Sequence, residues 1–102
     1  MELPRNYNNK YIIGGPCALE SREQLIDSAN ELLPLNINII RASLWKPRTQ
    51  TGWDGLGTLG IPLLLEEAEE RGFSPATEIM CADHAIALAQ YFKDFNHPVL
   101  VW

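Results

Sequence analysis

Positive charge gathers in one short part of the chain, at Arg41, Lys46 and Arg48, with no Asp or Glu among these cations. They are three of only 8 Lys and Arg residues in a chain that carries 13 Asp and Glu residues. An Arg presents a planar fork that suits phosphate or carboxylate, a Lys presents a compact charge, and Thr49 adds a hydroxyl donor. The segment predicts an anion-binding site; solvated loop charges, or partners for the acidic run 66–70, are the structural alternative.

Cysteine is the second residue type that could carry chemistry. Cys17 and Cys81 are far apart and form no CxxC pair, so the pattern does not support a disulfide framework or a structural zinc site. A lone thiol in a reducing compartment usually packs in a core. The N-terminus has no long apolar segment, and no run approaches the roughly 20 apolar residues that span a bilayer. We therefore expect a cytoplasmic protein with no membrane partner.

Composition limits the remaining classes. The chain has 102 residues, of which 46% are apolar, as expected for one globular domain at most. Its formal net charge is −5 and its pI is near 4.9. Nucleic-acid binding depends on clustered cations that neutralise phosphates, so we expect no nucleic-acid partner.

Hydrophobic patterning predicts strands that alternate with helices. Short β-prone runs predict strands at 11–13, 37–42, 76–80 and 98–102. Helical spacing predicts helices at 21–33, with a capping box formed by Ser21 and Gln24, and at 58–71, with Pro62 in the first turn and Gly72 after the end. A third helix is expected to begin at an Asp83 N-cap and to carry Ile86, Ala89 and Phe92 on one side.

The order β-α-β-α-β-α-β predicts an α/β fold with a parallel sheet in sequential order and helices on one face. Because no helix follows the apolar strand 98–102, we expect a truncated chain, with residues 1–102 forming the first half of a TIM (β/α)₈ barrel. Sites in such folds lie at the carboxyl ends of the strands. Those ends are Gly-Gly-Pro-Cys17, the segment 41–49 and Thr77-Glu78-Ile79-Met80.

One family carries the same motifs in the same order. Ile-Ile-Gly-Gly-Pro-Cys-Ala-Leu-Glu-Ser at 12–21, Lys-Pro-Arg-Thr at 46–49, Gly-Leu-Gly at 55–57 and Thr-Glu-Ile-Met at 77–80 resemble the type I 3-deoxy-D-arabino-heptulosonate 7-phosphate (DAHP) synthases. The resemblance is to the β subtype, found alone or fused to chorismate mutase. It implies a metal-dependent, aldol-like condensation of phosphoenolpyruvate with erythrose 4-phosphate, the first step of the shikimate pathway, by a full-length enzyme that we expect to be a homo-oligomer.

The resemblance also implies roles for individual residues. Cys17 matches a metal ligand, and a thiolate favours Mn, Fe, Co or Zn over Mg. Arg41 and Lys46 match groups that hold phosphoenolpyruvate, with Lys46 as the catalytic residue between the two substrates. Arg48 and Thr49, with Pro47 between Lys46 and Arg48, match the part of the motif that binds the aldose phosphate. Glu78 falls near the family's site without an assigned role.

The chain departs from the family pattern at three points. The loop after Thr49 is one residue shorter, Trp53 replaces a common Phe, and Cys81 stands where the β subtype often has Asp. The family's other metal ligands, a His, a Glu and an Asp, belong to later strands, and neither His84 nor His97 has the context to replace them. His84 is most simply a first-turn helix residue, and His97 a loop residue.

Two alternatives remain open. One is the sister synthase that joins phosphoenolpyruvate to arabinose 5-phosphate to form 3-deoxy-D-manno-octulosonate 8-phosphate, whose loop typically reads Lys-Ala-Asn-Arg where this chain has Lys-Pro-Arg-Thr. The other is a non-catalytic half-barrel that binds an anion.

Overall fold

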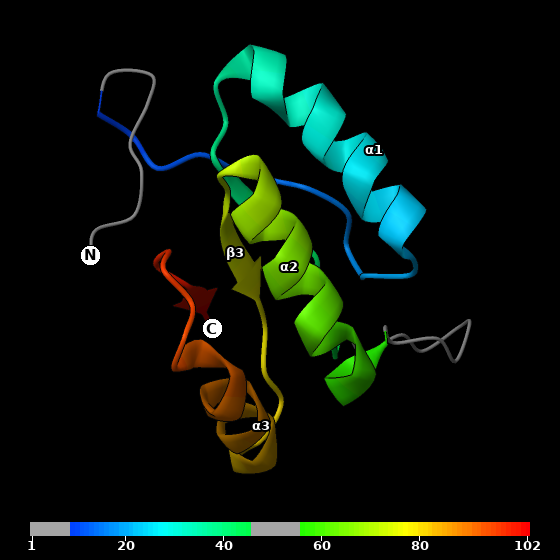
Figure 1. Cartoon of the computed structure of the whole chain (residues 1–102), viewed down its shortest axis with the longest axis vertical. Helices are drawn as coiled ribbons and strands as arrows, with labels where there is room; N and C mark the ends of the chain where they lie inside the picture. Colours follow the sequence, from blue (N-terminus) through cyan, green and yellow to red (C-terminus); the bar gives the residue numbers. More distant parts are fainter. Residues whose placement is uncertain (1–8, 46–55) are drawn as a thin grey trace.

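Four parallel strands and three helices alternate along the part of the chain that the structure describes (Figure 1). The computed structural model describes residues 9–45 and 56–102. The strands are β1 (Ile13–Gly14), β2 (Ile39–Arg41), β3 (Ser74–Thr77) and β4 (Leu100–Val101), and the helices are α1 (Arg22–Leu32), α2 (Ile61–Arg71) and α3 (Ala82–Phe92). Short 3₁₀ turns, η1 (Leu33–Leu35) and η2 (Gly57–Gly60), follow α1 and precede α2.

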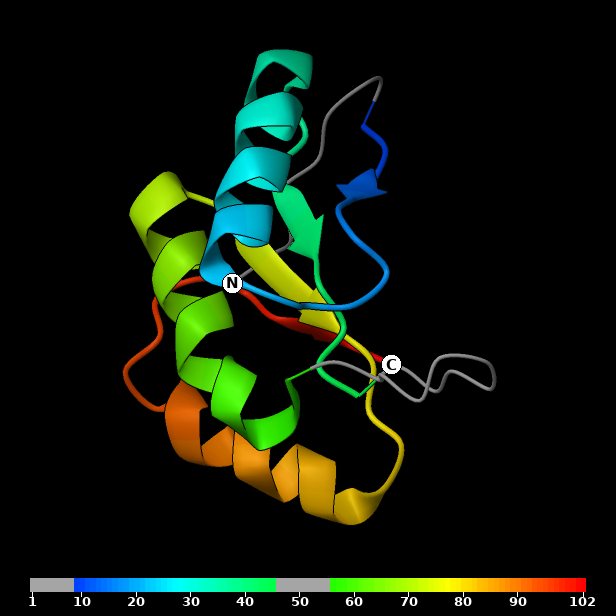
Figure 2. The same ribbon diagram turned by 90° about the vertical axis from the view of Figure 1, so that its right-hand side faces the viewer.

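The sheet has the predicted sequential order β1-β2-β3-β4, and all its pairs are parallel. Figure 2 shows the three helices on one side of the strands. Sequential parallel strands with helices on a single face are the arrangement of the first half of a (β/α)₈ barrel, as predicted, whereas an open doubly wound sheet has helices on both faces. In the part of the chain that the structure describes, no helix has the length and apolar character needed to cross a membrane.

The two faces of the sheet have different environments. Ile40, Ala42 and Leu44 join the core formed with the helices, which is centred on Leu25, Leu64, Phe73 and Leu88 among others. Side chains alternate along a strand, so Ile39 and Arg41 belong to the opposite face. Register places Arg41 beside Ala76, and Ala76 beside Leu100. This second face corresponds to the interior of a barrel.

Strand β3 begins two residues earlier than predicted, because it includes Ser74 and Pro75 and ends at Thr77. The Ser74 N–H donates to Asn38 at 2.9 Å, toward β2, so by alternation the nitrogen of Pro75 points toward β4. Pairing with β4 begins only at Ala76. The missing N–H of Pro75 therefore costs no ladder hydrogen bond.

Helix α1 is capped much as its sequence predicts. Ser21 is the N-cap, and its hydroxyl accepts from the Gln24 N–H at 3.1 Å. The returning bond differs from the capping-box form, because the Gln24 amide oxygen accepts from the N–H of Glu20, the residue before the cap, at 2.8 Å.

The start of α3 differs from the prediction. Cys81, and not Asp83, is the N-cap, and its side chain makes no capping bond. Leu88 is the buried residue of the helix, whereas Ile86 is 58% exposed and Ala89 is also exposed. The predicted apolar face was therefore wrong for these two positions.

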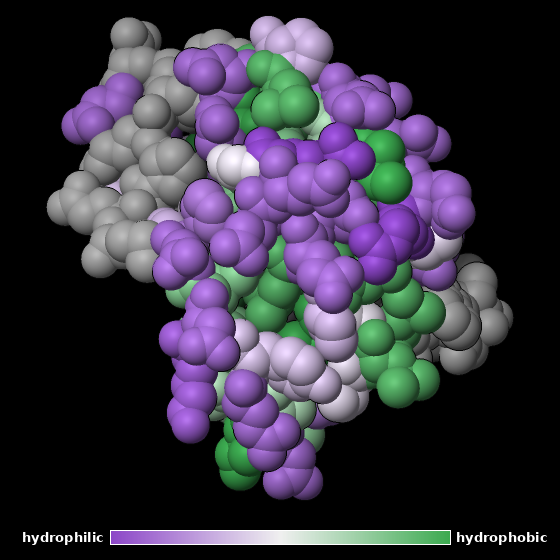
Figure 3. Space-filling view, viewed as in Figure 1, coloured by the Kyte–Doolittle hydropathy of each residue, from purple (hydrophilic) through white to green (hydrophobic). Residues whose placement is uncertain are grey.

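Helix α2 ends as predicted at Gly72, whose φ of 79° is left-handed. Its α-helical part begins at Ile61, after the 3₁₀ turn η2, with Pro62 in the first turn as expected. In the acidic run 66–70, the Glu67 side chain is buried, and the residue is only 4% exposed. Elsewhere, polar side chains predominate over the outer surfaces of α1 and α2 (Figure 3).

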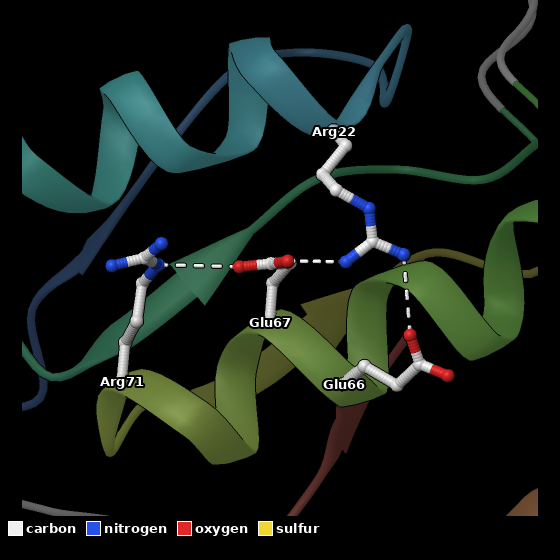
Figure 4. Close-up of polar contacts among 4 residues, drawn as sticks. All are labelled: Arg22, Glu66, Glu67 and Arg71. Carbon is white, nitrogen blue, oxygen red and sulfur yellow. Dashed lines mark hydrogen bonds and ion pairs between the residues drawn. The ribbon is translucent and has the colours of Figure 1, made fainter.

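Glu67 is buried because it lies between two arginines (Figure 4). Its carboxylate accepts from Arg22 of α1 and, at 3.2 Å, from Arg71 one turn further along α2. Arg22 also contacts the exposed Glu66 at 3.2 Å. Hydrogen bonds to Glu67 and Glu66 raise the pKa of the Arg22 guanidinium. Within the described residues, Glu66 and Glu67 of the acidic run are thus paired with arginines of α1 and α2.

The pairing of Glu67 with Arg22 and Arg71 predicts that Glu67 contributes more to the stability of the fold than Glu66 does. Glu67→Gln keeps the side-chain shape but removes the charge that two arginines share, and should lower the free energy of unfolding by about 1–3 kcal/mol. Glu66→Gln, at a solvent-screened pair, should change it far less. Denaturant unfolding of the two variants checks this, and equal losses would show that burial of Glu67 adds nothing to the pair.

Candidate functional site

The carboxyl ends of the strands bring together residues far apart in sequence. Arg41 is the last residue of β2, Thr77 is the last of β3, Cys17 follows β1, and Trp102 follows β4. In parallel α/β folds, sites form at this edge because the strand ends and the loops after them converge there. The two predicted site residues that the structure describes, Cys17 and Arg41, both lie at this edge.

The Arg41 guanidinium lies beside the loop that follows β1. Its Nη2 donates to the Gly15 carbonyl at 3.4 Å and to the Cys17 sulfur at 3.8 Å. Both contacts are long, so they hold the guanidinium loosely and leave donors for another acceptor. The geometry places a positive charge next to an exposed, free thiol. A fork-shaped cation and a soft donor therefore share one end of the sheet.

A cleft of about 430 Å³ opens beside Arg41 on the face of the sheet away from the helices. Ile13, Leu100 and Trp102 also line it. The two edge strands thus contribute to one cleft, which shows that this face of the sheet is concave. Among the described lining residues, the walls are apolar and the cation is Arg41, a combination that suits a small anion because low-dielectric surroundings strengthen its attraction to the guanidinium.

Gly15 is required by the close approach of β1 and β2. Its φ is +131°, and a Cβ built at this position would lie 2.1 Å from the Arg41 carbonyl oxygen. No L side chain fits there without moving the backbone of Arg41. The Gly-Gly-Pro-Cys motif therefore places the Cys17 loop directly against the end of β2.

Gly15→Ala should consequently lower the free energy of unfolding by about 2 kcal/mol or more, because backbone strain and a backbone clash act together. Gly72→Ala is the matched control, since Gly72 also has a positive φ, of +79°, but a Cβ added there would meet no atom within 4 Å. The Gly72→Ala variant should show only the backbone strain, which should lower its free energy of unfolding by about 1 kcal/mol. Denaturant unfolding measures both, and a Gly15→Ala protein as stable as Gly72→Ala would contradict the close approach.

The end of β2 is also tied to β3 by a side chain. The buried Thr77 hydroxyl accepts from the Leu44 N–H at 3.0 Å, and the Leu19 N–H donates to the Ser43 carbonyl at 2.9 Å. Within the described part of the chain, the fully buried Ser43 hydroxyl has no hydrogen-bond partner. The loops after β1 and β2 are thus anchored at the backbone before they reach the site.

Sequence reasoning missed one contact at this edge. The rings of Trp45 and His84 stack, with centroids 3.9 Å apart and planes 7° from parallel. The spacing of two such residues along the chain gives no signal of this contact, because only the β3–α3 connection brings them together. The interpretation of His84 as a first-turn helix residue is confirmed, since it is the third residue of α3.

The other predicted binding residues, Lys46, Pro47, Arg48 and Thr49, and the variant position Trp53, lie outside the described residues. A metal ion needs several ligands, and catalytic sites normally have three from the protein. Within residues 9–45 and 56–102, no three His, Cys, Asp or Glu side chains gather closely enough to hold one. The described residues thus fit a metal only in part, through the exposed Cys17 thiol.

Comparisons with known proteins agree with these motifs. The model of the DAHP synthetase I family matches residues 6–96. A phospho-2-dehydro-3-deoxyheptonate aldolase of Thermotoga maritima is 37% identical over 81 residues, which are 78% of this chain and 24% of the relative. The chain therefore spans about a quarter of that relative's length.

Solved structures give the same result. The crystal structure of a phospho-2-dehydro-3-deoxyheptonate aldolase (DAHP synthase) from Thermotoga maritima matches with a TM-score of 0.68 and 36% identity, over 78% of this chain and 23% of the other. A truncated form of 3-deoxy-D-arabino-heptulosonate 7-phosphate synthase from Thermotoga maritima matches with a TM-score of 0.61 and 34% identity. This match covers 78% of this chain and 28% of the truncated synthase.

Proposed function

The chain belongs to the DAHP synthetase I family, and from this premise we propose that the full-length protein condenses phosphoenolpyruvate with erythrose 4-phosphate. In this reaction a carbon–carbon bond forms between C3 of the enol and the aldehyde carbon, water adds at C2 of the enol, and inorganic phosphate leaves. The observation that carries the proposal is Arg41, which lies at the carboxyl end of β2, beside Cys17 and an apolar cleft.

Two phosphorylated anions repel each other, so the site must offset their charge while it aligns the reacting carbons. We propose that Arg41 and Lys46 bind phosphoenolpyruvate, that Lys46 lies between the substrates, and that Pro47, Arg48 and Thr49 bind the aldose phosphate. The loose hydrogen bonds of Arg41 to Gly15 and Cys17 support its part, because a phosphate or carboxylate would form stronger, charge-assisted bonds with the same guanidinium.

We propose that Cys17 supplies one ligand to a divalent ion of the Mn, Fe, Co or Zn type. The exposed thiol at the site edge supports this choice, and the other ligands would come from outside the described residues. A bound ion of this kind would act as a Lewis acid toward the aldehyde oxygen or a water.

We also propose that the protein acts in the cytoplasm as a homo-oligomer, with chorismate mutase as a candidate fused or associated partner. Cys17 and Cys81 are both free and exposed, as suits a reducing compartment.

A direct test measures release of inorganic phosphate from phosphoenolpyruvate by the full-length protein with a divalent metal. Release should require erythrose 4-phosphate, and arabinose 5-phosphate should not replace it. Equal rates with the two aldoses, or preference for arabinose 5-phosphate, would favour the sister synthase. Binding of phosphoenolpyruvate without turnover of either pair would indicate a non-catalytic anion-binding module.

A further inference from the structure

The Trp45–His84 stack joins two loops at the candidate site. Trp45 lies after the end of β2 and is followed directly in sequence by Lys46, whereas His84 lies in the first turn of α3. Both residues are half-buried. At a centroid separation of 3.9 Å and an angle of 7°, the rings are in full face contact. The imidazole is therefore one of the surfaces against which the indole packs.

The imidazole itself is held by the backbone. The Met80 N–H donates to His84 Nδ1 at 3.0 Å. An accepting Nδ1 carries no proton, so the neutral ring has its proton on Nε2. This bond fixes the orientation of the ring at the start of α3, and His84 presents one face to Trp45 as a rigid platform.

The backbone around Trp45 is held from two other directions. The Leu44 N–H donates to the Thr77 hydroxyl at 3.0 Å, and the Leu44 carbonyl accepts from the Gly57 N–H at 2.8 Å. A Cβ built on Gly57 would lie 3.4 Å from Nε1 of Trp45, so the glycine backbone packs against the edge of the indole. The indole also packs against the edge of the hydrophobic core, and His84 covers one of its faces.

We propose that His84 is a positioning residue, whose ring orients Trp45 and thereby the backbone from which Lys46 extends. The inference rests on the proposed function, because it gives His84 a role in placing the cation between the substrates. It assigns His84 no contact with substrate or metal. The competing interpretation is local: His84 serves only to satisfy the Met80 N–H at the start of α3.

Two substitutions separate these interpretations. His84→Asn places an amide oxygen where Nδ1 lies, which keeps the acceptor for Met80 and removes the ring. His84→Phe keeps a ring for Trp45 and removes the acceptor. If the stack positions Lys46, His84→Asn should lower kcat/KM for phosphoenolpyruvate about 10- to 100-fold with a thermal midpoint close to wild type, since small misplacements near reacting groups cost that much. His84→Phe should stay within about threefold of wild-type activity.

A double-mutant cycle traces the effect to the stack. Trp45→Leu should reduce kcat/KM about as much as His84→Asn, and the double variant should be no worse than either, because both changes break one contact. Additive losses would overturn the inference. The imidazole proton resonances of His84, which the indole ring current shifts in wild type, should move toward unstacked values in Trp45→Leu and stay shifted in the Cys81→Ala control.

Failure of this inference is distinguishable from failure of the proposed function. An active wild-type protein whose His84→Asn variant is equally active overturns the role of His84 and leaves the synthase proposal in place. Full activity in both variants, together with loss of stability in His84→Phe, also overturns the positioning role of His84. That outcome supports the local interpretation, in which His84 only satisfies the Met80 N–H. A wild-type protein inactive with both substrates overturns both proposals.

Discussion

Replacing Lys46 with methionine should reduce turnover of phosphoenolpyruvate and erythrose 4-phosphate to less than a few per cent of wild type. Methionine keeps the length and apolar stem of lysine but removes the charge. A preorganised cation at the point where charge develops typically contributes a factor on the order of 10²–10³ to the rate. Steady-state kinetics with both substrates measures the effect.

The fold should survive this substitution. The described backbone that leads to Lys46 is held by Leu44, through the Thr77 hydroxyl and the Gly57 N–H, and none of these bonds involves the lysine side chain. Lys93→Met is the matched control, because Lys93 is exposed at the end of α3, which is the opposite end of the helix from His84. Circular dichroism should be unchanged in both variants. Activity of Lys46→Met above a few per cent of wild type would defeat the assignment.

Much of the fold could be predicted because local signals and tertiary packing agree. The order of elements, the parallel sequential sheet, the Ser21 cap and the left-handed Gly72 all follow from short-range patterns. Predictions failed where a tertiary contact outweighed the local preference. The pattern predicts a strand that begins at residue 76, but β3 also includes Ser74 and Pro75. The acidic run was a candidate partner for the loop cations, but Glu67 is buried and paired with arginines of two helices.

The candidate site also has features that the sequence predicts and one that it does not. Cys17 and Arg41 could be placed at one edge because each follows a parallel strand, and the structure brings them within 3.8 Å. The Trp45–His84 stack could not be predicted, because it depends on how the β3–α3 connection turns. The sequence contains both ring types but no periodicity that relates them. Packing between loops has no counterpart in the strand and helix patterns used to read a sequence.

Removing the divalent metal should inactivate the full-length protein, and the loss should depend on Cys17. A thiolate is the softest ligand a protein offers to Mn, Fe, Co or Zn. Cys17→Ala removes it outright, so metal affinity should fall by more than the roughly 10–100-fold that the loss of an outer-shell partner costs. Chelator treatment followed by titration with Co²⁺ measures the affinity. Wild type should show a sulfur-to-cobalt charge-transfer band that the variant lacks.

The chain itself supplies the control for this experiment, because Cys81 is also free and exposed but lies at the start of α3 and makes no capping bond. Cys81→Ala should therefore keep the cobalt band, the metal affinity and the activity of wild type. Cys17 differs from it in position, because its sulfur lies 3.8 Å from the Arg41 guanidinium at the carboxyl ends of the strands. A Cys17→Ala protein that retains both the band and chelator-sensitive turnover would show that the metal is held without this thiol, and that Arg41 and Cys17 adjoin for another reason.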